Sequence, residues 1–490
     1  MEEKETAGVL AGLEPAAVFT YFEQICGIPH GSGNTEAISR YLEEFAIAND
    51  LWCQRDEMGN IIIKKDASPG YEDHEPVILQ GHMDMVCVAE EGVQIDFLKD
   101  GLSLEVKDGI ITAKGTSLGG DDGIAVAMSL AILADDSIPH PPLEVVVTVD
   151  EEVGMLGATA MDTSCLKGRK LLNIDSEEEG ILTLGCAGGA TVKASLPVNT
   201  IAKTGLKKAR LKVADLIGGH SGVEIDKGRA NACVLLGRVL ESISLQAEEE
   251  GKEFYIRRLS GGGKDNAIAN AAQADISFSA DFDPSKAIKE SEAIFRKEFV
   301  RTEPDLKLIL EDIEEEGSVY DAESTDKMIA MLRLLPAGIQ KMSMDIPGLV
   351  QTSLNLGILS SDVASASATF SVRSSVASEK EEMISRIRTL MKLLEGEVSV
   401  TGAYPAWEYK QDSKLREIMV EVFKRQYGKE PVLETIHAGL ECGLFSEKLH
   451  GVDAVSFGPN MKDIHSPREA MDVASVERTW KYLLEVLRNL

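Results

Sequence analysis

Several polar segments that contain His, Asp or Glu directly follow runs that predict buried strands. Residues 143–149 form a continuous β-branched run, and 170–174 is a second apolar run, as expected for strands buried on both faces. Such runs alternate here with helical patterns, which is typical of a layered α/β fold with parallel strands. Ligands of these folds gather outside the carboxyl ends of the strands. The polar segments are therefore expected to meet at one edge of one sheet.

Five side chains of these segments are candidate metal ligands: His82, Asp121, Glu152, Asp175 and His465. Two imidazoles and three carboxylates suit zinc, cobalt or manganese. One carboxylate can bridge two ions, and Glu151 stays uncoordinated beside a ligand, which indicates a two-metal hydrolase. Taken singly, each residue is more typical of a turn, a helix cap or a solvated acid. The prediction rests on all five sharing the position after a strand.

The 490-residue length exceeds that of a single core, so at least two domains are expected. From about residue 206 the strands alternate apolar and polar positions, which indicates antiparallel sheets with one wet face. Helices are predicted near 228–246, 284–300, 324–335 and 378–394. After about residue 402 the first pattern returns, with a helix at 414–423, a strand at 453–457 and a helix at 474–488. Residues 187–205 are expected to interrupt the pattern, and Asn34 is expected to cap a helix over 34–49.

These patterns predict an α/β catalytic domain with a mixed, mainly parallel sheet flanked by helices, plus an inserted α+β lid domain. The catalytic domain would comprise residues 1–187 and 402–490, and the lid residues 188–401. His465 would then return to complete a site whose other ligands all precede residue 176.

Composition excludes several classes of partner. A formal net charge of −31 disfavours nucleic acid and anionic membranes. The seven cysteines are odd in number and lack metal-site spacing, so buried free thiols in a reducing compartment are expected. The acidic start of the chain does not resemble a secretory signal, and no apolar run reaches membrane-spanning length. We expect a cytoplasmic protein.

The motifs together resemble the M20 clan of co-catalytic metallopeptidases, and within it the aminoacyl-histidine dipeptidase branch (peptidase D, cytosolic non-specific dipeptidase). The segments that carry the resemblance span nearly the whole chain: GlyHisMetAsp at 81–84, GlyGlyAspAspGly at 119–123, AspGluGlu at 150–152, AsnIleAspSer at 173–176, GlyHisSerGly at 219–222, HisAlaGlyLeuGluCysGly at 437–443 and IleHisSerProArgGlu at 464–469. One departure is Asp122, where the resemblance leads us to expect Asn. It would add a negative charge beside the metals.

The resemblance implies a role for each residue of the metal centre. His82 and Asp175 would hold one zinc ion, Glu152 and His465 would hold the other, and Asp121 would bridge them together with a water or hydroxide. Glu151 would be the general base. The carboxylate of Asp84, which shares a face with His82 in an extended segment, would accept the imidazole proton.

The resemblance also implies substrate-binding residues. His220 is similar to a histidine that stabilises the tetrahedral oxyanion. Asn266 and Arg373 are similar to groups that bind the substrate carboxylate, a task that suits the planar guanidinium. His437 and Glu441 lie four residues apart, so a helix would place them on one face. Glu441 would there receive the free amino group of a dipeptide.

The expected function is metal-dependent hydrolysis of dipeptides such as β-alanyl-histidine and of other short peptides. The alternative is an N-acyl amino acid amidohydrolase with the same two ions, for which Glu441 would be irrelevant because the substrate has no free amine. A third reading, in which the metals are structural and the insertion binds a protein, fits less well because structural zinc sites mostly use Cys and His and leave no spare base. The expected partner is a small peptide, and a homodimer is compatible with the sequence.

Overall fold

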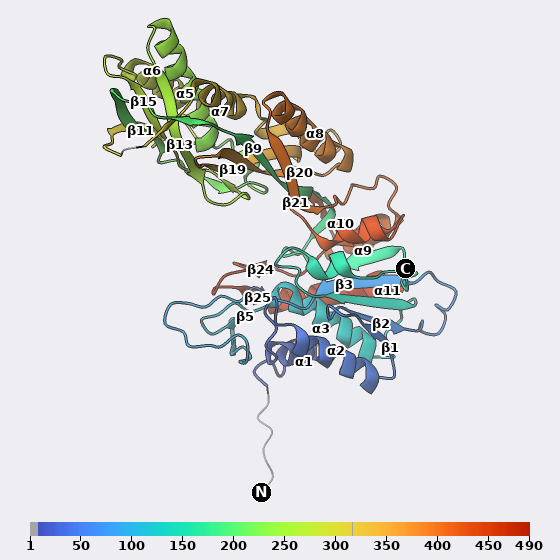
Figure 1. Cartoon of the computed structure of the whole chain (residues 1–490). Helices are drawn as coiled ribbons and strands as arrows, with labels where there is room; N and C mark the ends of the chain where they lie inside the picture. The colour runs from blue at the N-terminus through green and yellow to red at the C-terminus, as the bar shows by residue number, and fades with distance from the viewer. Residues whose placement is uncertain (1–7, 316) are drawn as a thin grey trace. The chain divides into compact units, whose positions relative to one another are not determined.

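The computed structural model describes residues 8–315 and 317–490, which form two compact units (Figure 1). Unit 1 comprises the chain up to Cys186 together with Trp407–Thr435 and Leu440–Leu490. Unit 2 comprises Ala187–Ala406 and Ile436–Gly439. Compared with the expected segments, the chain re-enters unit 1 at residue 407 instead of 402. Residues 436–439, which include His437, were also expected in the second catalytic segment and lie in unit 2.

The main sheet of unit 1 has eight strands. In spatial order these are β1 (Trp52–Arg55), β2 (Ile61–Lys65), β6 (Leu143–Thr148), β3 (Val77–His82), β7 (Lys170–Asn173), β23 (Asp453–Ser456), β8 (Ile181–Cys186) and β22 (Val432–Ile436). The central strands β6, β3, β7 and β23 run parallel, whereas β1, β2 and β8 pair antiparallel. Strands β3 and β6 are buried along their whole length, in agreement with their apolar sequences. The predicted mixed sheet is confirmed.

Helices flank this sheet: α1 (Ala16–Cys26), α2 (Glu36–Ala48), α3 (Gly120–Ala134), α4 (Leu156–Ala160), α9 (Lys414–Tyr427), α10 (Glu441–Lys448) and α11 (Val473–Arg488). Helix α3 is apolar and buried through Leu133, and it packs between α1 and β3. Helix α9 packs on β23 and α11. The expected cap at Asn34 is wrong, because the amide of Asn34 donates to the carbonyl groups of Phe97 and Leu98.

A second, smaller sheet of unit 1 was not predicted. Its four antiparallel strands lie in the order β24 (Met461–Lys462), β25 (Ala470–Asp472), β5 (Ile110–Ala113) and β4 (Leu104–Lys107). Each strand has only two to four residues, too few for an alternating pattern to be recognised. The loop between β24 and β25 carries His465.

Unit 2 is built on an antiparallel sheet of nine strands. Eight lie in the order β16 (Lys307–Asp312), β11 (Leu206–Ala214), β15 (Ala272–Ser279), β13 (Phe254–Gly262), β19 (Val350–Ser361), β20 (Ser365–Ser374), β9 (Gly188–Pro197) and β21 (Glu397–Tyr404), and β18 (Gly338–Met342) pairs with β19. Burial alternates along β9 and β11, as expected for a sheet with one covered face. Two short pairs, β10 (Thr200–Ile201) with β17 (Val319–Tyr320) and β12 (Gly219–His220) with β14 (Ala267–Ile268), lie outside this sheet.

Four helices of unit 2 match the predicted ranges closely. They are α5 (Ala232–Glu249), α6 (Ser285–Glu298), α7 (Ala322–Leu334) and α8 (Ala377–Leu393), and a short 3-10 helix, η1, spans Ile225–Lys227. Helix α5 packs on β11, β13, β15 and β19, and α8 packs on β9, β20 and β21 (Figure 1). These contacts enclose the separate apolar core of unit 2.

The change of pattern expected at 187–205 coincides with the start of unit 2 at Ala187, although much of this segment is strand, since β8 ends at Cys186 and β9 spans Gly188–Pro197. The glycines of this segment allow the backbone of another segment of the chain to pack closely against it. A Cβ atom on Gly188 would lie 2.5 Å from the backbone nitrogen of Ala406, and one on Gly189 would collide with the Tyr404 ring. Glycine is therefore needed here for packing.

All seven cysteines lie in the described part of the chain and are free thiols, as predicted. Four are buried, whereas Cys53, Cys87 and Cys165 are partly exposed. No helix of the described residues combines the length and apolar character needed to cross a bilayer.

Candidate metal centre and active site

The five predicted ligands converge in unit 1, and each is placed by the end of a regular element. His82 ends β3, Asp175 follows β7 by two residues, and Glu152 follows β6 by four. Asp121 lies in the first turn of α3, and His465 lies in the loop between β24 and β25. Because β3, β6 and β7 are parallel neighbours, their carboxyl ends meet at one edge of the sheet.

The ligand atoms form two groups that share Asp121. One comprises His82, Asp121 and Asp175, and the other comprises Asp121, Glu152 and His465; within each group the atoms lie within 4.8 Å of one another. Asp121 Oδ1 lies 3.4 Å from Nε2 of His82, and its Oδ2 lies 3.1 Å from Nε2 of His465. One carboxylate thus presents one oxygen to each group, which is the geometry of a bridging ligand.

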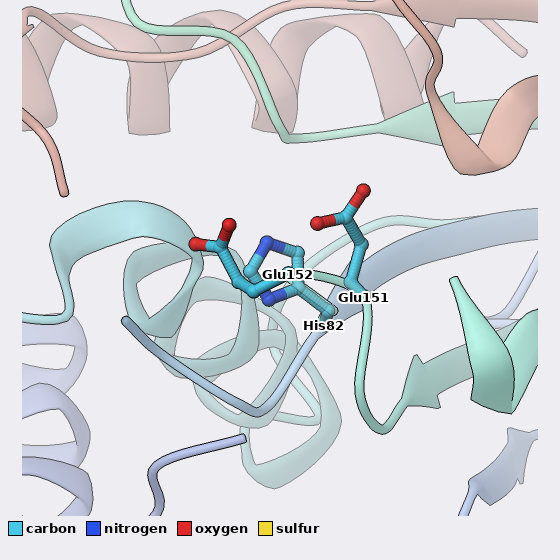
Figure 2. Close-up of side chains that lie close together, drawn as sticks. All are labelled: His82, Glu151 and Glu152. Carbon is cyan, nitrogen blue, oxygen red and sulfur yellow. The ribbon is translucent and has the colours of Figure 1, made fainter. Parts of the chain in front are cut away.

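Glu151 forms a third group, with His82 and Glu152. In the view of Figure 2 the His82 ring lies between the two carboxylates, which extend to the same side from the loop after β6. Burial, with repulsion from Glu152, raises the pKa of Glu151 to about 7. A carboxylate with a pKa near neutrality is suited to proton transfer.

Asp84 supports the site in a different way from the one predicted. The acceptor nearest to Nδ1 of His82 is the backbone carbonyl of Asp84, at 3.0 Å, and the carboxylate oxygen is 3.6 Å away. The carboxylate instead accepts from the hydroxyl of Ser32 at 2.7 Å and from the backbone N–H of Glu151 at 3.0 Å. Asp84 therefore fixes the orientation of the imidazole through its main chain and holds the Glu151 loop through its side chain.

The centre concentrates buried carboxyl groups. Burial, with repulsion from Asp122, raises the pKa of Asp175 well above its ordinary value. The hydrogen bond to Asp121, with the negative charge of Glu152, raises the pKa of His465 to about 10. Glu152 Oε1 lies 2.7 Å from Nε2 of His465, yet no donor points to it with hydrogen-bond geometry. Such a set of facing acceptors fits divalent cations, which would replace the imidazole proton.

Glu441 begins α10 and lies fully buried in unit 1. Its Oε2 accepts from Gln80 and Thr148, each at 2.6 Å, whereas its Oε1 has no hydrogen-bond partner among the described residues. Burial, with repulsion from Glu151, raises the pKa of Glu441 to about 8. The predicted helix that joins His437 to Glu441 is wrong, because α10 starts at Glu441 and His437 belongs to unit 2.

His220 lies in unit 2 with its protonation pattern fixed by the main chain. Its Nδ1 accepts from the backbone N–H groups of Gly222 and Val223, at 3.1 and 3.2 Å. Burial, together with the charge of Arg373, lowers the pKa of His220. The ring is therefore neutral and carries its proton on Nε2, where it can donate.

The other predicted residues of unit 2 surround His220. Arg373 is buried on β20, where its Nη1 donates to the Tyr404 hydroxyl at 3.0 Å and its Nε finds no acceptor within the part of the chain that the structure describes. His437 Nε2 lies 2.7 Å from the hydroxyl of Ser353. The Asn266 side chain is exposed, and the backbone carbonyl of Asn266 accepts from the N–H of Ser221 next to His220.

The comparisons with known proteins agree with this geometry. The sequence model of peptidase family M20/M25/M40 matches residues 78–489. The chain belongs to this family. This M20 peptidase is 36% identical to the cytosol non-specific dipeptidase of Escherichia coli over 484 residues, which are 98% of this chain and 99% of the relative.

Solved structures show the same relationship. The aminoacylhistidine dipeptidase of Vibrio alginolyticus matches with a TM-score of 0.92 and 34% identity, over 98% of both chains. The aminopeptidase PepT of Bacillus cereus matches with a TM-score of 0.55 and 16% identity, over 97% of this chain and 98% of that one, which shows a common fold alone. The M20 fold with an inserted domain, predicted from sequence, is thus confirmed.

Several residues that shape the site were missed from sequence. Gln80, Thr148 and Ser32 bind its charged groups, but isolated polar residues of this kind carry no signal in a sequence. Glu469 was within a recognised segment and received no role. Its position four residues after His465 was the one available signal.

Proposed function

We propose that this M20 peptidase is a two-metal dipeptidase. The observation that carries the proposal is the pair of ligand groups joined by Asp121, with Glu151 outside both. His82 and Asp175 would hold one ion, and Glu152 and His465 would hold the other. The donor set fits Zn²⁺ best, with Co²⁺ or Mn²⁺ as alternatives. When bound, two such ions lower the pKa of a water molecule and polarise the scissile carbonyl.

Glu151 is proposed as the general base. It takes a proton from the attacking water and passes it to the leaving amine, as a carboxylate free of metal can do. Its loop is anchored by the hydrogen bond from the Glu151 N–H to Asp84. This anchor keeps the base in place while its own carboxylate stays free to accept and release the proton.

Unit 2 is proposed to act as the substrate-binding lid. The Nε2–H of His220 would donate to the oxyanion of the tetrahedral intermediate, which the neutral tautomer fixed by Gly222 and Val223 supports. Arg373, with an unpaired Nε, would bind the substrate carboxylate together with Asn266. His437 would contact the same group as a neutral ring.

The free amino group of the substrate is proposed to bind Glu441 through its unpartnered Oε1. Recognition of both ends would limit substrates to about two residues, because a longer peptide would not bring both its amine and its carboxylate to these groups. The names of the relatives from Escherichia coli and Vibrio alginolyticus support dipeptides as the substrates, with aminoacyl-histidine dipeptides among them. The first of these names also supports a cytoplasmic location for this chain.

The test is a substrate panel with metal analysis. β-Alanyl-histidine, an α-dipeptide, a tripeptide and an N-acetylated amino acid are offered to the enzyme with two zinc ions, to the chelated enzyme, and to the chelated enzyme after zinc is returned. We expect hydrolysis of the dipeptides, its loss with the chelator and its recovery with zinc. Preference for the acetylated amino acid would favour the amidohydrolase alternative. Hydrolysis that is independent of metal would refute the two-metal site.

A further inference from the structure

The side chain of Glu469 joins two distant segments of the metal centre. It is only 3% exposed, and it lies four residues after His465, next to β25. Its carboxylate accepts four consecutive backbone N–H groups: those of Leu118 at 2.8 Å, Gly119 at 3.2 Å, Gly120 at 2.8 Å and Asp121 at 3.3 Å. The single buried side chain of Glu469 thus binds the main chain of Asp121. It also lies at the end of the loop that carries His465.

This contact replaces a local helix cap. The first N–H groups of a helix have no partner inside it, and a carboxylate near them is favourable. The residue before α3 is Gly119, which has no side chain to cap with and has φ +67°. A Cβ on Gly120 would lie 3.3 Å from Glu469 Oε1, so little space remains between the helix start and the carboxylate. The cap of α3 therefore comes from a residue about 350 positions later in the chain.

The two ligand groups do not depend equally on this contact. His82 and Asp175 follow strands of the central sheet, and the His82 side chain is only 1% exposed. His465 lies in a loop, its side chain is 44% exposed, and its φ is +57°. Little packing of its own holds His465 at 3.1 Å from Asp121. The Glu469 contact supplies a buried link between the two segments that carry these ligands.

We propose that Glu469 is a positioning residue for the ion held by Asp121, Glu152 and His465. Without its carboxylate, four N–H groups at the start of α3 lose their acceptor, and the His465 loop is no longer tied to Asp121. The affinity for this ion should fall while the ion at His82 and Asp175 remains. The inference rests on the proposed two-metal function.

The variant Glu469→Gln tests the proposal with little change in shape. A carboxamide offers one oxygen, and its NH₂ group would face two N–H donors, so it cannot serve both pairs. The matched control is Glu144→Gln. Glu144 is also 3% exposed in unit 1, and it accepts from the N–H groups of Lys167 at 2.9 Å and Gly168 at 2.8 Å. It lies near the start of β6, at the opposite end of that strand from Glu151.

Metal binding is measured on the full chain, independently of hydrolysis. The metal-free proteins are titrated with Zn²⁺ in competition with a chromophoric chelator, and with Co²⁺ by visible absorption. His465→Ala identifies the absorption that belongs to the second ion. We expect Glu469→Gln to lower the affinity for this second ion by about tenfold or more, as loss of a residue that orients ligands does. The affinity for the first ion should be retained. Glu144→Gln should bind both ions like the wild type.

Three results overturn the proposal. The first is wild-type affinity for both ions in folded Glu469→Gln. The second is an equal loss of affinity for both ions in Glu469→Gln, or an equal loss of metal affinity in the Glu469 and Glu144 variants. Either result would show a general loss of stability. The third is a wild-type protein that binds fewer than two ions, which refutes the proposed function as well and is thereby distinguished from the first two. If Glu469→Gln does not fold, Glu469→Asp, which withdraws the carboxylate by one methylene, replaces it with the same expected and refuting results.

Discussion

His437 is buried in unit 2 as a neutral imidazole, so acid should destabilise the protein through this residue. Its side chain is 7% exposed, and burial, with the charge of Arg373, lowers its pKa from 6.5 to about 4. In the unfolded chain the pKa returns to its ordinary value. Between pH 6.5 and 4 the unfolded state therefore binds a proton that the folded state excludes. The contribution to stability is complete above pH 6.5 and is lost as the pH falls towards 4.

The magnitude follows from the displacement of the pKa. At about 1.4 kcal/mol for each pKa unit, the full effect is about 3 kcal/mol. Integration of the proton linkage gives a loss of about 2 kcal/mol between pH 7 and pH 5. This is a substantial part of the roughly 5–15 kcal/mol that separates folded from unfolded domains.

Hydrogen exchange in urea measures this loss within unit 2. Peptides from β19 and β20 are followed by mass spectrometry at pH 7 and pH 5, for the wild type and for His437→Gln, with exchange corrected to the intrinsic rate at each pH. Gln can still bond to Ser353 but does not titrate, so the difference between the proteins isolates His437. We expect the wild type to lose about 2 kcal/mol more than the variant. Equal losses would refute the neutral buried state and would return His437 to the candidates for a cationic carboxylate ligand.

Four further substitutions test the site. Glu151→Ala should retain both ions by metal analysis and lower kcat for a dipeptide by roughly 10²–10⁴-fold; normal turnover would remove it as the base. His220→Ala should lower kcat by roughly two to three orders of magnitude, and unchanged kcat would exclude the oxyanion role. Arg373→Lys should raise KM by roughly tenfold because lysine lacks the planar fork, and an unchanged KM would argue against carboxylate binding. Asp122→Asn should change zinc affinity by less than about threefold if burial keeps the acid protonated, whereas a large loss on titration would show that its charge matters.

The sequence predicted those parts of the fold well in which a helix or strand is long enough to show its hydrophobic pattern. Helices α5 to α8 and the buried strands β6 and β7 were expected within a few residues, because each has enough turns or apolar positions to be recognised. The small sheet of β4, β5, β24 and β25 was missed because its strands are too short. The glycines at 188 and 189 were taken as a break in the pattern, since a sequence does not distinguish a flexible glycine from one required by close packing of another segment.

The site was predictable for a related reason. His82, Asp175 and Glu152 lie at fixed short distances after strands, so the layered topology alone brings them to one edge. The contacts that orient these residues follow no such rule. The carboxylate of Asp84 binds the Glu151 N–H and not the imidazole, and Glu441 reaches Gln80 from a helix about 360 residues away. Such contacts depend on tertiary packing, which leaves no period and no spacing in the chain.

Asp122 shows how packing also decides what a residue contributes electrically. As an aspartate, it is expected from sequence to add a negative charge beside the ions. In the folded chain it is fully buried, its Oδ2 accepts from the N–H of His82 at 3.2 Å, and its Oδ1 has no partner in residues 8–315 and 317–490. Burial raises the pKa of Asp122 well above its ordinary value. Any side chain at Gly81 would collide with Asp122 Oδ2, so this glycine leaves the space in which the acid is enclosed. Gly81, the glycine before the ligand His82, therefore helps to set the charge of the distant residue Asp122, through burial and not through contact with the metal.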